Sequence, residues 1–155
     1  MPGNPACADV LPGQPAPYLF SFSVAGGLVP DAPETYTFPA PYADGSVTID
    51  VDSSNLGPVF DFTINGPYAA RGVIAKGGPN ANFYNYAPPT YPNGIGADDN
   101  LHAPVNPANN TYYGLSRIDF CVVRDRYNYN NDNNNVNGAA VVTSNGAAIA
   151  NGRNA

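Results

Sequence analysis

The sequence predicts an all-β protein: an antiparallel β-sandwich of about seven short strands, with long loops and a strand-forming C-terminal tail. Three observations favour this fold class. Of 155 residues, 17 are Pro, 16 are Gly and 21 are Asn, and Pro and Gly interrupt helices. Short segments alternate apolar and polar residues with the period of two that half-buried strands show. Turn signals separate these segments at the spacing typical of sandwiches, and none has a convincing helical pattern.

The chain begins with a segment of different character. Residues 1–17 contain five prolines and no periodicity, so we expect an extended lead-in. Residues 18–123 form the predicted sandwich domain. Its first strand, residues 18–24, places Phe20, Phe22 and Val24 on one face and serines on the other. A Gly-Gly pair then ends the strand.

The remaining strands follow from the same alternation. We expect them at residues 35–38, 47–51, 59–64, 71–76, 83–86 and 115–123. Asp-Gly before residue 47, Asn-Gly-Pro after residue 64 and Gly-Gly-Pro after residue 76 supply the turns. Residues 87–114 are predicted to be a long loop. In the last strand Ile118, Phe120 and Val122 point inward, while Asp119 and Cys121 share the opposite face.

The two cysteines lie near opposite ends of this region. Cys7 and Cys121 would close a loop of about 115 residues, which constrains the unfolded state by roughly 4–5 kcal/mol at most. An even cysteine count in a small, loop-rich chain favours the disulfide. The alternative is a pair of free buried thiols. A metal site made from two cysteines and one histidine so far apart in sequence is not expected.

Composition changes abruptly after the last predicted strand. All 17 prolines lie at or before Pro107, whereas residues 128–155 have ten asparagines and only two charges. Residues 124–137 are predicted to be a polar, Asn-rich linker. Residues 138–155 form the predicted tail. Asn-Gly-Ala-Ala followed by small apolar residues begins at residue 137 and again at residue 145, eight residues apart. Two such units are too few for a free-standing solenoid.

The tail has two interpretations. It is a frayed end or a terminal hairpin folded onto its own domain through Asn145-Gly146, or it is a strand that pairs with another molecule. The second is attractive because the tail contains no proline and almost no charge. The predicted assembly strand consists of Ala139, Ala140, Val141, Val142, Thr143, Ala147, Ala148 and Ile149.

Net charge and hydropathy exclude several partner classes. The net charge is -6, and the six basic residues are not clustered, so we expect no nucleic-acid partner. No apolar run reaches the roughly 20 residues of a membrane span, and the N-terminus has no signal-peptide pattern. One Lys, one Met, no Trp and abundant Asn, Thr and Tyr are unusual for a cytosolic enzyme. We therefore expect an extracellular or cell-surface location, with any export signal removed or outside this chain.

No reaction centre is visible. His102 is the single histidine, and no nucleophile elbow accompanies Ser116. Lys76-Gly77-Gly78 lacks the glycines that precede the lysine of a phosphate-binding loop. We expect no catalytic residues, no required cofactor and no enzymatic activity.

Two binding chemistries remain open. Oxygen ligands for calcium could come from Asp44, Asp50, Asp52, Asp98 or Asp99, and Asp50 and Asp52 share one strand face, but no spacing fixes a site. A glycan platform could form from five tyrosines, since exposed aromatic rings stack on sugars. They are Tyr84, Tyr86, Tyr91, Tyr112 and Tyr113. Asn109-Asn110-Thr111 is an N-glycosylation sequon by pattern.

Three segments together resemble a family. They are residues 71–86, Arg-Gly-Val-Ile-Ala-Lys-Gly-Gly-Pro-Asn-Ala-Asn-Phe-Tyr-Asn-Tyr; residues 101–107, Leu-His-Ala-Pro-Val-Asn-Pro; and residues 113–121, Tyr-Gly-Leu-Ser-Arg-Ile-Asp-Phe-Cys. They are similar to motifs in a small β-rich domain of secreted and cell-surface bacterial proteins, which also has an early Asn-Pro-x-Cys like residues 4–7. The resemblance spans about residues 4–123. It implies an extracellular module with paired cysteines and no established activity.

The sequence therefore favours a non-enzymatic extracellular structural subunit, which assembles into a filament or surface layer by strand exchange with a neighbour. In this hypothesis residues 139–150 complete a sheet in the next subunit. The alternative is a cell-surface binding module for glycan or calcium.

Overall fold

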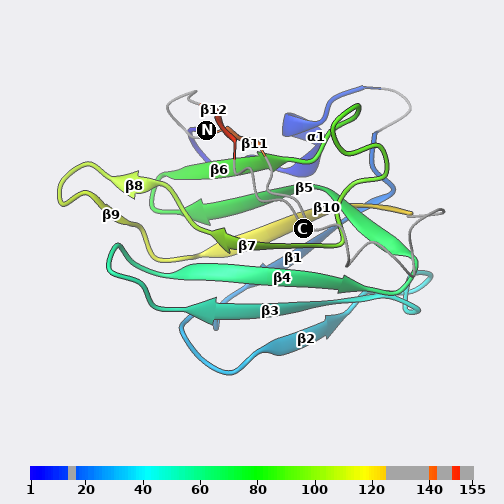
Figure 1. Cartoon of the computed structure of the whole chain (residues 1–155), viewed down its shortest axis with the longest axis horizontal. Helices are drawn as coiled ribbons and strands as arrows, with labels where there is room; N and C mark the ends of the chain where they lie inside the picture. The colour runs from blue at the N-terminus through cyan, green and yellow to red at the C-terminus, as the bar shows by residue number, and fades with distance from the viewer. Residues whose placement is uncertain (14–16, 125–139, 143–147, 151–155) are drawn as a thin grey trace.

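A computed structural model describes residues 1–13, 17–124, 140–142 and 148–150 of the chain. Two antiparallel sheets face each other, with the four-stranded sheet in the lower half of the view in Figure 1. The six-stranded sheet has the order β1 (Phe20–Ala25), β10 (Arg117–Arg124), β5 (Tyr68–Gly77), β6 (Asn80–Asn85), β11 (Ala140–Val142) and β12 (Ala148–Ala150). The four-stranded sheet has the order β2 (Glu34–Thr37), β3 (Ser46–Asp52), β4 (Val59–Asn65) and β7 (Ala97–Leu101). The predicted all-β sandwich is confirmed.

The main core fills the space between the sheets. Alternate residues of β3 and β4 are buried, as the period of two predicts. From the facing sheet, β10 contributes Ile118, Phe120 and Val122, each 0% exposed, which confirms the predicted inward face. Phe62 meets Phe120 edge to face, with ring centroids 5.4 Å apart. Aromatic pairs of this kind favour a well-ordered core.

A second, smaller core covers the outer face of the six-stranded sheet. Cys121, Ile74 and Phe83 point to this side and are covered by the N-terminal segment with Cys7 and Leu11. The predicted extended lead-in is therefore wrong at one point: α1 (Cys7–Val10) makes a single helical turn. The Asp9 carboxylate accepts a hydrogen bond from the Ala6 amide and caps that turn.

The predicted long loop at residues 87–114 is also wrong. It contains β7 on the four-stranded sheet, and β8 (Val105–Asn106) pairs with β9 (Thr111–Tyr112) in a small hairpin. Ten strands thus lie between Phe20 and Arg124, rather than about seven. β7 has the sequence Ala-Asp-Asp-Asn-Leu. The sequence pattern does not indicate a strand here because Asp is depleted in strands.

A β-bulge interrupts β5. Cys121 pairs with Gly72 and the next residue of β10, Val122, pairs with Ala70, so Arg71 is the extra residue. A bulge bends its strand and turns one side chain in a new direction. No helix among the described residues is both long and apolar enough to cross a membrane.

Candidate functional site

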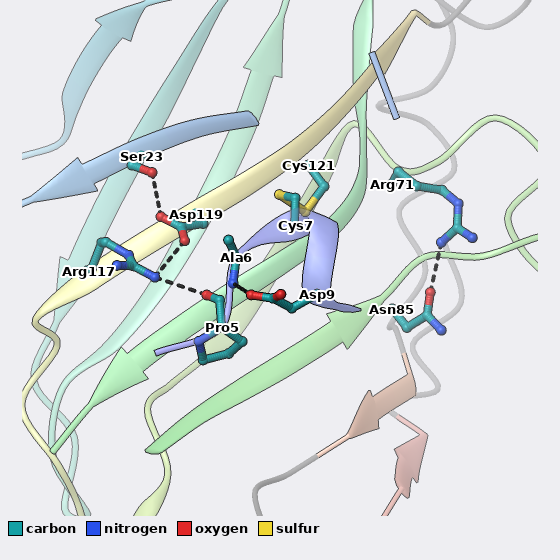
Figure 2. The surroundings of a disulfide bond; sticks show 10 residues. All are labelled: Pro5, Ala6, Cys7, Asp9, Ser23, Arg71, Asn85, Arg117, Asp119 and Cys121. Carbon is teal, nitrogen blue, oxygen red and sulfur yellow. Dashed lines mark hydrogen bonds and ion pairs between the residues drawn. A yellow bond between two sulfur atoms is a disulfide. The ribbon is translucent and has the colours of Figure 1, made fainter. Parts of the chain in front are cut away.

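The disulfide attaches the lead-in to a central strand. Cys7, at the start of α1, is bonded to Cys121 of β10, with their Cα atoms 5.7 Å apart and a separation of 114 positions in sequence. Figure 2 shows α1 lying across the strands at this point. The predicted pairing is confirmed, and both half-cystines are buried within the second core. The bridge is therefore a structural staple on the outer face of the sheet.

A partly buried ion pair lies beside this disulfide. The Arg117 guanidinium lies 2.8 Å from the Asp119 carboxylate and also donates to the Pro5 carbonyl over 3.0 Å. The Ser23 hydroxyl donates to the other carboxylate oxygen of Asp119 over 2.6 Å (Figure 2). Asp119 is 4% exposed and lies on the face of Cys121, as the alternation predicts. The charge is stable there because it is paired and hydrogen-bonded.

The outer edge of β6 is covered in two pieces. At its first half, the Ala81 amide donates to the Met1 carbonyl over 2.7 Å and the Ala81 carbonyl accepts from the Met1 ammonium. The Gly3 amide donates to the Pro79 carbonyl over 2.9 Å. The N-terminal residues therefore occupy this half of the edge as a short extended segment.

The other half of the edge pairs with the tail. Ala140 is opposite Asn85, Val141 opposite Tyr84 and Val142 opposite Phe83, in antiparallel register. The Ala81 backbone turns outward, so the backbone groups of the residues two and four positions later, in Phe83 and Asn85, also turn outward. β11 therefore satisfies amides and carbonyls that would otherwise form an open sheet edge.

The described part of the tail folds onto its own chain. β11 and β12 pair with each other and β11 pairs with β6 of the same chain, which is the terminal hairpin that the sequence left open as an alternative. Of the predicted assembly residues, Ala140, Val141, Val142, Ala148 and Ile149 lie in these strands. Ala139, Thr143 and Ala147, the Asn145-Gly146 turn and the linker beyond Arg124 lie outside the described residues. Exchange between molecules stays a prediction.

The three segments that carry the family resemblance meet around the turn between β5 and β6. A Cβ atom on Gly77 would lie 2.5 Å from the Ala103 side chain and 2.6 Å from the Gly114 carbonyl, so only glycine fits. Gly78 has φ +59°, a conformation that glycine adopts without strain, and lies under the Tyr113 ring. The Ser116 amide donates to the Lys76 carbonyl over 2.9 Å.

Buried polar contacts complete this assembly of segments. The Asn82 amide group, 1% exposed, donates to the His102 carbonyl over 2.9 Å. The Tyr84 hydroxyl accepts from the His102 amide over 2.8 Å. Burial raises the pKa of Tyr84, so this hydroxyl stays neutral at physiological pH. The resemblance motifs therefore fix β6, the strand to which the tail adds, against the rest of the domain.

Three carboxylates form a cluster on the outer face of the four-stranded sheet. Ligand oxygens of Asp50, Asp52 and Asp61 all lie within 4.8 Å of one another. Burial, and then the charges of Asp99 and the two β3 carboxylates, raise the pKa of Asp61, against the hydrogen bond from the Asn100 amide. Asp61 was missed from sequence. It is opposite Asp50 in the β3–β4 register. Asp50 and Asp61 are equally far in sequence from the middle of the turn between the two strands, and this symmetry is the sequence signal that identifies Asp61.

The other predicted calcium ligands lie in different surroundings. Asp98 is buried and accepts a hydrogen bond from the Tyr86 hydroxyl over 2.8 Å. Asp44 accepts from the Tyr68 hydroxyl over 2.7 Å. Asp99 is close enough to Asp61 to affect its pKa. The acidic cluster therefore combines Asp50, Asp52 and Asp61, with Asp99 nearby, and excludes Asp98 and Asp44.

His102 has a structural environment. One ring nitrogen lies 2.8 Å from the Ala103 carbonyl, and the ring stacks on Tyr112 at 3.7 Å. Burial lowers the pKa of His102, which favours the neutral ring. These contacts match a loop histidine bonded to backbone.

The proposed tyrosine platform does not form. Tyr84, Tyr86 and Tyr91 are 2%, 0% and 8% exposed, and all three belong to the main core. Tyr112 stacks on His102, and Tyr113 covers Gly78. Three of the five rings are therefore inside the core, and the five together do not form an exposed stacking surface for sugars.

No family model matches the chain, and neither a curated protein nor a solved structure matches it.

Proposed function

We propose that the protein is a non-enzymatic extracellular structural subunit that assembles by exchange of its C-terminal hairpin between neighbouring molecules. The observation that carries this proposal is the β6 edge. The structure completes it with β11, a segment that follows β10 only after the 15 residues 125–139. A strand added at an edge and encoded this far from its partner is the arrangement that exchange requires.

Chain length allows the exchange. A linker of 15 residues reaches at most about 50 Å when fully extended, which is more than the width of a domain of this size. β11 can therefore occupy the β6 edge of its own molecule or that of a neighbour through the same hydrogen bonds. The balance between the two forms depends on protein concentration and linker strain. Because donor and acceptor are different surfaces, the contact runs head to tail and need not close.

The staple supports an extracellular role. The Cys7–Cys121 bridge is compatible with an oxidising compartment outside the cytoplasm. Covering the β6 edge also matters for solubility, since an open edge pairs with other chains without specificity. The tail in this proposal gives that edge one defined partner.

Deletion of residues 137–155 tests the proposal. The shortened chain keeps both cores, so we expect a folded monomer on size-exclusion chromatography and no filaments in negative-stain images, while the full chain assembles. Unchanged oligomers after the deletion would contradict the proposal. A synthetic peptide covering residues 138–155 should bind the shortened chain.

Single substitutions in β11 provide a matched pair. Val142→Pro removes an amide that points toward β6, and its ring hinders pairing. Val142→Ile keeps that amide. Peptides covering residues 138–155 that carry these changes should differ in affinity for the shortened chain. The proline peptide should bind at least tenfold more weakly than the parent peptide, and the isoleucine peptide should bind as tightly as the parent. Equal binding of both would show that backbone pairing does not hold the tail.

A calcium-binding module is the second candidate, because the structure brings Asp61 to the two carboxylates that the sequence singled out. Calcium prefers carboxylate oxygens. Added calcium should then raise the melting temperature of the wild type and leave Asp61→Asn unchanged. No calcium-dependent shift in the wild type would remove this candidate.

A further inference from the structure

An open pocket of about 270 Å³ lies beside the β5 bulge, and no residue of the acidic cluster lines it. Its wall includes Arg71 and Arg124, together with Asn93 from the segment after β6. Three prolines complete its apolar surface: Pro17, Pro88 and Pro92. Basic and apolar groups therefore meet in one hollow of an otherwise acidic molecule.

Different structural features position the guanidinium groups of Arg71 and Arg124. Arg71 is the extra residue of the β5 bulge, so its side chain leaves the regular alternation of the strand. Its guanidinium donates to the Asn85 carboxamide over 2.8 Å (Figure 2). Arg124 ends β10, lies over the Tyr68 ring at 4.9 Å and donates to the Tyr68 hydroxyl over 3.2 Å. Among the described residues, no carboxylate takes part in holding either group.

Within the described part of the chain, most of their hydrogen-bonding capacity is unused. A guanidinium carries five N–H donors, and among the described residues Arg71 and Arg124 each make one hydrogen bond. The chain has 12 acidic against six basic residues, yet the ion pair within the described part of the chain belongs to Arg117. Burial lowers the pKa of Arg71, because desolvation disfavours the charged form of the guanidinium. An anion in the pocket would stabilise that charged form.

We propose that this pocket binds the carboxylate of a uronic acid unit in an acidic glycan. A carboxylate matches a guanidinium in shape and accepts two parallel hydrogen bonds from it. The Asn93 side chain makes no hydrogen bond within the described residues and offers both a donor and an acceptor for a sugar hydroxyl. The prolines offer apolar contact to the ring. This role is additional to assembly and does not depend on it.

Size and backbone pairing favour a sugar over a peptide. The pocket volume of about 270 Å³ is below the range of roughly 300–1,000 Å³ for drug-sized ligands, so it admits one sugar ring. A bound peptide would need free backbone groups nearby. The amide and carbonyl of Ala70 beside the bulge are already paired with Ile95, at 2.8 and 2.9 Å.

The test uses the full-length, disulfide-bonded chain and three probes: trigalacturonate, its methyl ester, and inorganic phosphate. The ester keeps the sugar and removes the charge. In ¹H–¹⁵N NMR titrations we expect trigalacturonate to shift the signals of Arg71, Asn93 and Arg124, and at least tenfold weaker binding of the ester. Equal binding of the ester, or equal binding of phosphate, would overturn the proposal.

Variants locate the site. Arg71→Gln and Asn93→Asp should each weaken trigalacturonate binding at least tenfold, the second by placing a carboxylate in the pocket. Lys76→Gln, at the other end of β5, is the matched loss of a cation and should leave affinity unchanged. Asn93→Asp alters no described hydrogen bond, so it remains informative if Arg71→Gln misfolds. Retained affinity in Asn93→Asp, or equal loss in Lys76→Gln, would refute the assignment.

Discussion

Removing the disulfide should weaken the domain strongly without preventing it from folding. The bridge closes a loop with a sequence separation of 114 residues. The chain-entropy relation for a loop of this length gives about 16 cal/mol/K, or about 4.8 kcal/mol at 25 °C. Part of that figure is lost to residual structure in the unfolded chain. We therefore expect Cys7→Ala with Cys121→Ala to lower the free energy of unfolding by about 3–5 kcal/mol.

The structure explains why folding should survive. The lead-in is also held by contacts of Met1 to β6, of Gly3 to the turn before β6, and of Pro5 to Arg117. The main core lies on the other face of the sheet. Urea unfolding followed by tyrosine fluorescence measures the change, with the reduced wild type as a control for the alanine substitutions. The m-value, which is the dependence of the free energy of unfolding on urea concentration, should also increase, because an unbridged unfolded chain exposes more surface. A loss below about 1 kcal/mol would refute the reasoning.

Three further substitutions test individual contacts by urea unfolding. Arg117→Met leaves the buried Asp119 carboxylate without its cation and should cost about 2–4 kcal/mol; a cost near zero would contradict the importance of the pair. Tyr86→Phe removes the hydroxyl that donates to Asp98 and should cost about 1–3 kcal/mol, whereas an unchanged midpoint would show that the bond is dispensable. Asp61→Asn should stabilise the calcium-free protein at neutral pH, because a carboxyl whose pKa is raised on folding opposes folding when ionised. That gain should vanish as pH falls below the ordinary range of Asp; a gain independent of pH would contradict the electrostatic cause.

The sequence predicts those parts of the fold that depend on local alternation. The inward face of β10 and the alternating burial of β3 and β4 follow from side-chain period alone. β7 could not be predicted in this way because its buried Asp98 depends on the Tyr86 hydroxyl, a partner twelve residues away in sequence. The α1 turn escaped notice because four residues carry no periodic signal.

The candidate sites show the same division. The cysteine pair follows from count and context and is confirmed. The assembly segment, which rests on the distribution of proline and charge, stays a prediction. The Arg71 pocket required the structure, because a bulge in β5 directs the side chain and residues from distant segments complete the wall. For the tyrosines, the sequence suggests a site that the structure does not form. Aromatic residues near a predicted loop suggested an exposed platform, but three of the five rings are core residues.

Cross-linking between two differently tagged variants tests the central claim most directly. Asn85 and Ala140 are opposite each other in the β6–β11 register, and Cα atoms in such a pair lie at about 5.5 Å, a separation that suits a disulfide. Asn85→Cys and Ala140→Cys would be placed in separate chains, refolded together and oxidised, with the double variant in one chain as a control for geometry. Strand exchange predicts a disulfide-linked heterodimer on a non-reducing gel. Closure in the double variant with no heterodimer from the mixture would contradict it.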